Sequence, residues 1–342
     1  MTRRLRARTP DPARAPGIRW GVIGTGWIAD RFIASAHRHT AQRFSAIGSR
    51  DPDRARPFAA AHGITDVVDV DELVAHPEVD VVYVASPHPF HADHALAAIR
   101  AGKHVLVEKP LGLDAGEARR IAVAARSAGV FCAEALWTFF LPRFDVVAQV
   151  LESGVIGRLR TVLAEYGEYL PDDHRAMDPR LAGGSLLDLG TYPIATISRY
   201  LGAPARVEAL GAENAFGVNE QTGLLVADPA GALGIGFTSL GSSTPSGATF
   251  AGTAGAIELP GPFYQPGPVV VRTWSGGVVA EFDEPAIAHD GLHHEAAAVA
   301  RAIDAGLTEA PERPLDESVA FLALMDDVRV RIGVDFAAAR TD

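Results

Sequence analysis

Two pairs of residues carry most of the chemistry that this sequence suggests. Lys109 follows Glu108 at the end of an apolar run. Tyr192 stands four residues after Asp188, a spacing that would place both on one face of a helix. A lysine ammonium group stabilises the oxyanion of a carbonyl being reduced, and a tyrosine hydroxyl beside a cation can give or take a proton. Each pair alone also fits a structural role, as a salt bridge or a buried tyrosine. Together they indicate acid–base chemistry at an alcohol or carbonyl group.

A glycine-containing turn indicates where the electrons come from. Gly24-Thr25-Gly26-Trp27-Ile28-Ala29 has the pattern G-x-G-x-x-A and stands between an apolar run and a helical pattern, as a dinucleotide-binding turn requires. The first glycine allows the tight turn, and the second lets the backbone approach a pyrophosphate that rests on the helix N-terminus. A turn without a ligand is the alternative, which the alternating pattern that follows makes less favoured. The turn predicts a nicotinamide dinucleotide bound by residues 24–28.

The residues after the second apolar run bear on the choice between NADP and NAD. An acidic residue there would bind a ribose 2′-hydroxyl, whereas an arginine would accept the 2′-phosphate of NADP. Asp51 precedes Pro52 and fits a helix N-cap followed by proline, so it has another role. Ser49, Arg50 and Arg54 offer a hydroxyl and two guanidinium groups for a phosphate. They favour NADP over NAD, although a solvated surface arginine is the ordinary alternative.

A histidine-containing loop lies where such folds bind their ligands. Ser86, His88 and His91 follow an apolar run, and therefore lie at the carboxyl edge of the predicted sheet. We expect these three residues, with Glu108 and Lys109 after the next run, to surround the cofactor. For His91 alone, a structural role at the start of the next helix is favoured.

The elements that must position these residues follow two patterns. From residue 18 to about 132, short apolar runs alternate with helical patterns, as in a parallel sheet wrapped by helices. Beyond about residue 158, polar and apolar residues alternate between Gly/Pro turns, and two helices close the chain. The sequence predicts an α/β protein with an N-terminal Rossmann domain, a doubly wound parallel sheet, over 17–134. A C-terminal α+β domain with an open, mostly antiparallel sheet is expected over 135–342, and a disordered basic tail over 1–16.

The expected elements are short and closely spaced. Strands are expected at 18–23, 43–49, 79–86, 103–107 and 130–133 in the first domain, and at 160–167, 206–213, 222–227, 233–240, 256–259, 268–273 and 278–282 in the second, with helices at 91–101, 115–128, 291–305 and 315–332.

The composition excludes several classes of protein. The 42 acidic residues outnumber the 31 lysines and arginines, and a net charge of −11 disfavours nucleic acid and anionic membranes as partners. No apolar stretch reaches the ~18 residues that a membrane helix needs. A single cysteine, Cys132, cannot form an intrachain disulfide, which suits a reducing compartment such as the cytoplasm. We expect a cytoplasmic protein with a small-molecule substrate.

A histidine-rich run opens the first of the closing helices. His289, His293, His294 and Glu295 have ligand types that zinc uses. Helix capping and solvation explain polar residues at such a place, and hydride chemistry with a lysine and a tyrosine needs no metal. No metal is therefore expected, and the rim of a substrate pocket is the favoured functional role for this run.

Three motifs together resemble those of the Gfo/Idh/MocA family of nicotinamide-dependent oxidoreductases. They are the turn at 24–29, Glu108-Lys109-Pro110, and the run from Gly183-Gly184 to Tyr192, in this order and spacing. The resemblance covers nearly everything from 18 to 336. Tyr192 and the runs 134–138 and 331–336 are most similar to the branch holding dimeric dihydrodiol dehydrogenase and NADP-dependent D-xylose dehydrogenase.

The resemblance implies a role for individual residues. Lys109 and Tyr192 would form the catalytic pair, with Tyr192 as general acid/base and Asp188 orienting the substrate or the tyrosine. Trp137 would line the nicotinamide end of the site. The branch also implies NADP as cofactor and a homo-oligomer, a dimer or a tetramer.

Substrate contacts are expected near the glycine pair, with one departure from the family pattern elsewhere. His174 and Arg175 stand where this branch keeps variable substrate contacts. Relatives in the branch often carry an arginine after the Trp-Thr pair, where this chain has Phe139. That puts any contact assigned to the arginine in doubt, although Arg143 lies one turn further on.

The sequence therefore predicts an NADP(H)-dependent oxidoreductase that acts on a CH–OH or carbonyl group of a sugar, polyol or cyclic diol. A nucleotide-sugar ketoreductase ranks lower, because only Arg272 lies between Arg206 and Arg301 to bind a diphosphate. A non-catalytic protein that senses a dinucleotide or a sugar is the alternative from another class. Retention of both Lys109 and Tyr192 argues against a pure sensor.

Overall fold

The computed structural model describes residues 2–284 and 290–340, and it divides the chain into two compact units. The parallel-sheet unit comprises Pro10–Phe140 and His289–Val319. The mixed-sheet unit comprises Met1–Thr9, Leu141–Ala288 and Ala320–Asp342. Among the described residues, no helix has the length and apolar character needed to cross a membrane.

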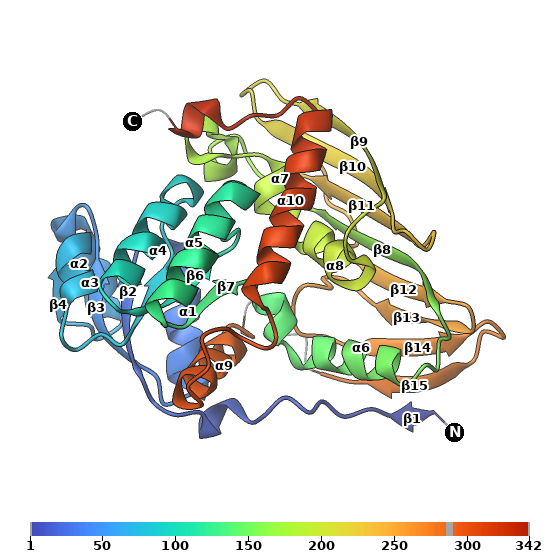
Figure 1. The fold of residues 1–342 in the computed structure, drawn as a ribbon, viewed down its shortest axis with the longest axis horizontal. Helices are drawn as coiled ribbons and strands as arrows, with labels where there is room; N and C mark the ends of the chain where they lie inside the picture. The colour runs from blue at the N-terminus through green and yellow to red at the C-terminus, as the bar shows by residue number, and fades with distance from the viewer. Residues whose placement is uncertain (1, 285–289, 341–342) are drawn as a thin grey trace. The chain divides into compact units, whose positions relative to one another are not determined.

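The parallel-sheet unit is built on six parallel strands in the order β4-β3-β2-β5-β6-β7. Helices α4 and α5 lie side by side over β5 and β6 (Figure 1). The predicted doubly wound sheet is confirmed, with a short additional strand, β4. The bounds are β2 (Arg19–Ile23), α1 (Trp27–His39), β3 (Arg43–Gly48), α2 (Pro52–Ala61), β4 (Asp66–Val68), α3 (Val70–Ala75), β5 (Val81–Val84), α4 (His91–Arg100), β6 (His104–Glu108), α5 (Ala115–Ala128), β7 (Cys132–Ala135) and α9 (His293–Asp304).

Local sequence signals set the ends of these helices. The Asp51 carboxylate accepts a hydrogen bond from the Arg54 backbone N–H at 3.2 Å, and Pro52 is the first residue of α2, as the sequence predicts. The Asp114 carboxylate caps α5 in the same way, and Gly129 ends that helix in the left-handed conformation with φ 65°. The strands between the helices are held by burial.

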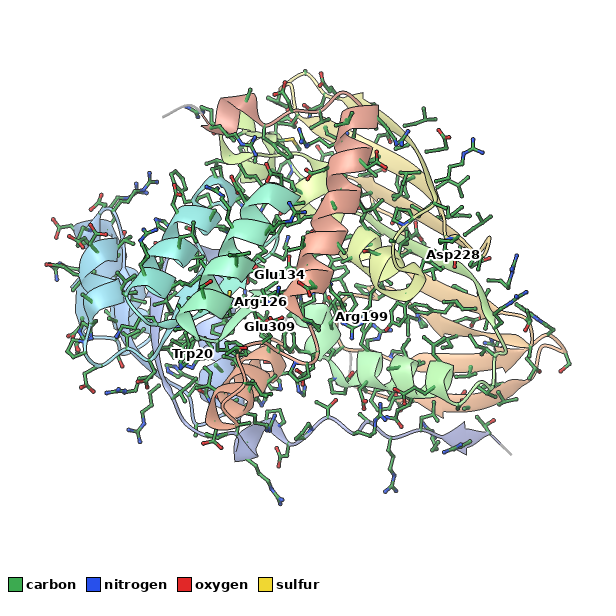
Figure 2. All side chains as sticks on the ribbon, in the orientation of Figure 1. Trp20, Arg126, Glu134, Arg199, Asp228 and Glu309 are labelled. Carbon is green, nitrogen blue, oxygen red and sulfur yellow. The ribbon has the colours of Figure 1, made fainter. Side chains whose placement is uncertain are left out.

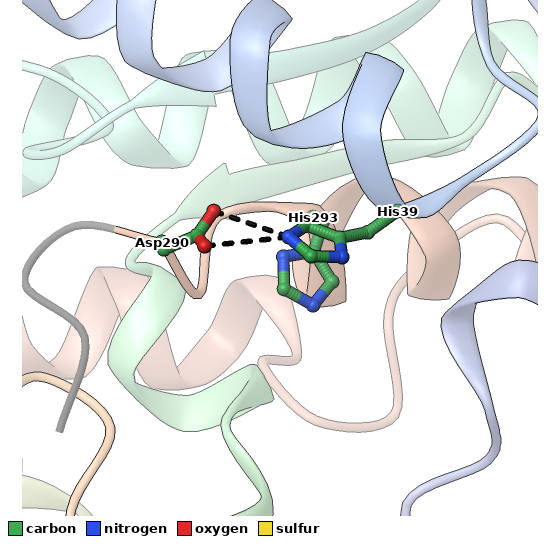
Figure 3. A group of neighbouring side chains, drawn as sticks. All are labelled: His39, Asp290 and His293. Atoms are coloured by element: carbon green, nitrogen blue, oxygen red, sulfur yellow. Dashed lines mark hydrogen bonds and ion pairs between the residues drawn. The ribbon is translucent and has the colours of Figure 1, made fainter. Parts of the chain in front are cut away.

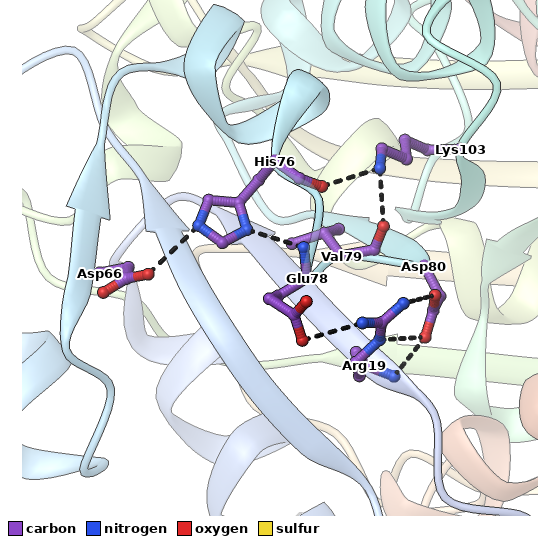
Figure 4. A network of polar contacts seen from close by, with 7 residues as sticks. All are labelled: Arg19, Asp66, His76, Glu78, Val79, Asp80 and Lys103. Atoms are coloured by element: carbon purple, nitrogen blue, oxygen red, sulfur yellow. Dashed lines mark hydrogen bonds and ion pairs between the residues drawn. The ribbon is translucent and has the colours of Figure 1, made fainter.

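The amino edge of this sheet carries a network of paired charges (Figure 4). The Arg19 guanidinium donates to both Asp80 carboxylate oxygens, at 2.9 and 2.6 Å. The Lys103 ammonium group donates to the backbone carbonyl oxygens of His76 and Val79, at 2.8 and 2.7 Å. The arginine holds the pKa of Asp80 below its ordinary value. The network is completed by Asp66, which pairs with His76, and Glu78, which pairs with Arg19.

The mixed-sheet unit contains a nine-stranded sheet in the order β1-β15-β14-β13-β12-β8-β11-β10-β9. Among the described strand pairs of this sheet, only β1–β15 and β8–β11 are parallel, so the prediction of a mostly antiparallel sheet is confirmed. The bounds are β1 (Arg3–Arg4), α6 (Pro142–Glu152), β8 (Leu159–Gly167), α7 (Ser185–Asp188), α8 (Thr191–Leu201), β9 (Arg206–Glu213), β10 (Asn219–Ala227), β11 (Leu233–Ser239), β12 (Ala248–Gly252), β13 (Gly255–Leu259), β14 (Val269–Thr273), β15 (Val278–Phe282) and α10 (Leu315–Arg331), whose first turn belongs to the other unit.

Helix α8 packs on one face of the mixed sheet, over β8 and β11. Gly234 makes this close approach possible, because a Cβ there would lie 2.4 Å from the Ile197 side chain. On the same sheet, Leu163, Ile235 and Leu225 are cross-strand neighbours on β8, β11 and β10, and each is 40–44% exposed. One face of the sheet is thus covered by α8, while an apolar row is exposed to solvent.

The N-terminal segment differs from its prediction. Residues 3–4 form β1 beside β15, and residues 12–14 form a short 3-10 helix, where a disordered tail over 1–16 is expected. The Arg8 guanidinium donates to Asp145 on α6 at 3.0 Å. Ion pairs and strand pairing therefore order a segment whose composition alone indicates disorder. Strand β12 is also absent from the expected elements, because its small residues hide the alternation.

Candidate active site

The glycine turn connects β2 to α1 as predicted. Gly24 has φ 110°, and a Cβ there would lie 2.5 Å from the Ala85 carbonyl oxygen, so only glycine fits. A Cβ on Gly26 would meet nothing within 4 Å, which leaves open space at the start of the helix. Among the described residues, no side chain caps α1. Its first N–H groups are therefore placed to bind an anion, and Thr25 and Trp27 beside them are exposed.

Arg50 lies just after the end of β3, and the neighbouring acidic residue, Asp51, is engaged in a capping hydrogen bond. Asp51 is held by its capping bond, and the Ser49 hydroxyl donates to the Asp51 carbonyl oxygen at 3.0 Å. The Arg50 guanidinium lies 4.8 Å from the centre of the Phe90 ring, which holds it at this edge of the sheet. This arrangement suits a cationic contact to a 2′-phosphate more than an acidic contact to a ribose.

His91 connects the loops that follow β5 and β6. Its two ring nitrogens lie 2.8 Å from the carbonyl oxygens of Ser86 and Pro110, and the ring is fully buried. These contacts give His91 the structural role that is favoured for it alone. The Ser86 hydroxyl lies 3.0 Å from a ring nitrogen of His94, and His88 is buried beside His91. The loop predicted to face the cofactor is thereby held rigidly at the carboxyl edge.

The turn that carries Lys109 is anchored on both sides. Glu108, at the end of β6, is buried and accepts hydrogen bonds from the Tyr83 hydroxyl and from the Lys109 backbone N–H. Two residues beyond the lysine, the Leu111 N–H donates to Glu134 at 3.0 Å. Both carboxylates act on the backbone around Lys109, which fixes where its side chain starts.

Sequence reasoning misses the partner of Glu134. This glutamate and Arg313 are both fully buried, and the guanidinium donates twice to one carboxylate oxygen, at 2.9 and 2.8 Å (Figure 2 labels Glu134). The Ser318 hydroxyl donates to the same oxygen at 2.7 Å. The arginine also lies 5.2 Å from the centre of the Phe139 ring. A buried pair of this kind needs several hydrogen bonds to offset the cost of desolvating both charges. A charged residue inside the apolar strand β7 is the only sequence signal for it.

In the mixed-sheet unit, Tyr192 belongs to a cluster of three tyrosines. Its ring centre lies 4.6 Å from that of Tyr264 and 5.7 Å from that of Tyr166. Burial raises the pKa of both neighbouring phenols, and the Tyr166 hydroxyl donates to Glu168 at 2.6 Å. Tyr192 itself is only 9% exposed. The sequence identifies Tyr192 but gives no signal for the two rings that pack against it.

The expectation that Asp188 and Tyr192 share a continuous helix is wrong. Helix α7 ends at Asp188, and α8 begins only at Thr191, with Gly190 between them. A Cβ on Gly190 would lie 2.5 Å from the Leu186 carbonyl oxygen, which explains the glycine at this break. The buried Asp188 carboxylate pairs with the half-exposed Arg175 guanidinium at 2.8 Å. Two of the residues expected to contact substrate are thus brought together.

The structure also locates His174, Trp137 and Arg54, the remaining residues predicted for the site. A ring nitrogen of His174 accepts the Ala176 N–H at 3.2 Å, which starts a short 3-10 helix. Trp137 is buried directly after β7. Arg54 is exposed on α2.

The histidine run lies at the start of α9. His289 lies outside the described residues, and His293, His294 and Glu295 open the helix. Burial lowers the pKa of His294 to about 3 and raises that of Glu295 well above its ordinary value, with Glu108 adding to the second shift. Both shifts favour the uncharged form of each side chain, which suits its burial inside the fold.

Comparison with known proteins decides the family. Residues 18–136 match the oxidoreductase family with an NAD-binding Rossmann fold, and residues 144–258 match the GFO/IDH/MocA C-terminal domain. The chain belongs to the Gfo/Idh/MocA family of NAD(P)-binding oxidoreductases. The first match lies within the parallel-sheet unit and the second within the mixed-sheet unit.

Relatives in this family are similar over most of their length. Trans-1,2-dihydrobenzene-1,2-diol dehydrogenase from Bos taurus is 34% identical and the human protein 33%, each over 93% of this chain and 98% of the relative. A 3-ketoreductase from Actinomadura kijaniata, solved with NADP and TDP-benzene, is 30% identical with a TM-score of 0.82 over 93% of this chain and 98% of the other. An aldose-aldose oxidoreductase from Caulobacter crescentus, 20% identical with a TM-score of 0.81 over 92% and 97%, shares the fold.

The structure explains Phe139, the position at which the sequence departs from the family pattern. Phe139 packs against Arg313, so the position serves the fold. Arg143 is fully buried, and burial lowers its pKa to about 10. Burial also raises the pKa of nearby Glu284 to about 7. Arg143 therefore does not supply the missing contact, because its guanidinium donates to the carbonyl oxygens of Pro260, Pro262, Phe263, Gln265 and Pro268.

Proposed function

We propose that this oxidoreductase uses NADP(H) and moves a hydride between the nicotinamide and a CH–OH or carbonyl carbon of a sugar, polyol or cyclic diol. The observation that carries the proposal is the position of Lys109. It follows β6, two strands along the sheet from the glycine turn after β2, at the same carboxyl edge. Ligands of open parallel sheets bind at this edge.

The cofactor residues fit a dinucleotide carrying a 2′-phosphate. The uncapped start of α1 suits the pyrophosphate, and the open space at Gly26 allows close backbone approach. Arg50, held over Phe90, would bind the 2′-phosphate, with Ser49 and Arg54 as neighbours. When bound, the nicotinamide supplies or accepts the hydride. Support from relatives is the ketoreductase solved with NADP.

The proposed catalytic roles divide between two residues. In the oxidation direction, Tyr192 as its phenolate takes the proton of the substrate hydroxyl while the substrate carbon would give up a hydride, and Lys109 stabilises the developing oxyanion. Asp188, paired with Arg175, would orient the substrate, with His174 nearby in sequence. Trp137 would border the nicotinamide. In the reduction direction the same proton returns from Tyr192.

The test is the conservative variant Tyr192→Phe. It keeps the ring that packs against Tyr264 and removes only the hydroxyl. We expect turnover of aldoses, polyols or cyclic diols to fall by about 100-fold or more, the size of a lost general acid/base, with NADPH binding unchanged. The matched control is Tyr200→Phe, on the same helix, which should keep its activity. Equal turnover in wild type and Tyr192→Phe would remove Tyr192 from the mechanism.

A nucleotide-sugar ketoreductase is the second candidate. The observation in its favour is the 30% identity to a ketoreductase solved with TDP-benzene. Against it, Arg272 already pairs with Glu258 at 2.9 Å, so this arginine is occupied. Assays with a nucleotide-linked ketosugar beside the free sugars distinguish the two: a strong preference for the linked sugar would favour the ketoreductase.

We also propose a homo-oligomer, a dimer or a tetramer, in the cytoplasm. The exposed apolar row of Leu163, Leu225 and Ile235 is the kind of surface that association covers. The buried free thiol of Cys132 suits a reducing compartment. Sedimentation of wild type and Leu225→Glu tests the first point: a shift of the variant to monomer supports it, and a monomeric wild type contradicts it.

A further inference from the structure

The end of α1 and the residues before α9 bring together three metal-ligating side chains. These are His39, Asp290 and His293, whose ligand atoms all lie within 4.8 Å of one another (Figure 3). The His39 Nε2 atom is 3.3 Å from each Asp290 carboxylate oxygen. The two imidazole rings lie with their centres 4.2 Å apart. The three residues belong to the same compact unit.

Neighbouring groups hold these side chains in place. The Ser35 hydroxyl lies 3.0 Å from the His293 Nδ1 atom and 3.4 Å from Asp290 Oδ1. The Arg38 guanidinium donates to the other carboxylate oxygen, Oδ2, at 3.2 Å, and His39 Nε2 lies equally near both oxygens. Such outer contacts orient the ligands of metal sites. Arg38 is 63% exposed, so its charge is largely screened by water.

The cluster has access to solvent. A cavity of about 420 Å³ borders it, lined in part by Asp11, Thr40, His39 and His293, with room for water molecules to complete a coordination shell.

We propose that His39, Asp290 and His293 form a binding site for a divalent transition-metal ion of the zinc class. Two imidazoles and one carboxylate with an open fourth position are the donor set that zinc accepts, and oxygen-preferring magnesium or calcium suits it poorly. The histidine run noted in the sequence contributes only His293, and the partners come from outside it. The ion would tie the end of α1 to the start of α9.

The site is separate from the proposed chemistry. It lies at the C-terminal end of α1, and a helix of 13 residues places it about 20 Å from the glycine turn at the other end. The proposal does not rest on the proposed function, and its failure would leave that function untouched.

The experiment measures metal binding by the tag-free full-length chain. Protein stripped with a chelator is dialysed against zinc and analysed for metal content, and cobalt is used as a spectroscopic probe. We expect one equivalent of zinc per wild-type chain, a visible cobalt d–d absorption band, and a rise in the unfolding temperature with zinc but not with magnesium. Wild type that retains no zinc above buffer would overturn the proposal.

Matched variants locate the ion. His39→Gln and the isosteric Asp290→Asn should lose the bound equivalent, the cobalt band and the thermal shift, with circular dichroism confirming that they fold. The control His76→Gln removes a histidine that pairs with the single carboxylate of Asp66, and it should bind zinc like wild type. Retention of a full equivalent by both His39→Gln and Asp290→Asn would place the ion elsewhere and refute the assignment.

Discussion

The two edges of the parallel sheet use the same residue types in different ways. At the amino edge, Arg19 pairs with Asp80, and Lys103 donates to two backbone carbonyl oxygens. Both cations are thus bound by groups of the protein itself. At the carboxyl edge, the glycine turn leaves open space, and Arg50 and Lys109 stand at strand ends. Lys103 and Lys109, the only lysines in the chain, lie at the two ends of the same strand, β6. Under the proposed function, position along a parallel strand, more than residue type, separates a structural charge from a functional one.

The largest expected effect separates the two lysines. Lys109→Ala should lower kcat by about 100- to 1,000-fold, the loss measured when one stabilising contact to an oxyanion is removed. Lys103→Ala removes hydrogen bonds at the amino edge and should lower the unfolding temperature while kcat stays close to wild type. Steady-state kinetics with NADPH check both. Similar losses of kcat in the two variants would break the comparison.

The next effect concerns the buried pair that supports the carboxyl edge. Glu134→Gln removes the buried counter-charge of Arg313 and leaves the partly exposed Glu317 carboxylate at 3.7 Å, so it should lower the free energy of unfolding by about 3–5 kcal/mol. The control is Arg126→Ala, which breaks half-exposed pairs with Glu309 and Asp316 and should cost about 1 kcal/mol or less (Figure 2 labels Arg126 and Glu309). Urea unfolding measures both values. A Glu134→Gln protein as stable as Arg126→Ala would show that the buried pair does not anchor the turn.

A smaller effect is expected on cofactor choice. Arg50→Ala should raise the Kd for NADPH by about ten- to a hundredfold, the equivalent of one hydrogen bond to a charged group. Binding of NADH should stay unchanged, because it has no 2′-phosphate. Arg43→Ala, at the amino end of the same strand, is the control and should leave both affinities as they are. Equal weakening of both cofactors by Arg50→Ala would contradict the role in 2′-phosphate binding.

The smallest effect belongs to the amino edge and depends on pH. Arg19 lowers the folded-state pKa of Asp80 below its ordinary value of 3.8. The carboxylate therefore contributes stability that is present above about pH 4 and is lost as the pH falls through the lower folded-state pKa. Asp80→Asn should cost about 1 kcal/mol or less at neutral pH, because the pair is partly exposed. Urea unfolding of both proteins should show this difference shrinking in acid, and a difference that grows in acid would contradict the sign.

Local signals made much of the fold predictable. The capping role of Asp51, the glycine turn and the rhythm of five of the six strands depend on residues close in sequence, and each is found where it is expected. The site's supporting contacts were not predictable, because they join distant residues. Arg313 lies 179 residues after Glu134, and Tyr264 lies 72 after Tyr192. The helix expected through Gly190 is interrupted there, and only glycine fits at the break because a Cβ would meet the Leu186 carbonyl oxygen.

The most direct test of the central claim is nicotinamide absorbance during turnover. Wild-type protein is assayed with NADP(H) and with NAD(H) against a panel of aldoses, polyols and cyclic diols, with NADPH binding followed in parallel by fluorescence. The account predicts turnover that prefers NADP(H) over NAD(H) with at least one of these classes. Tight NADPH binding without turnover on any of them would contradict it and favour a sensing protein that retains the oxidoreductase fold.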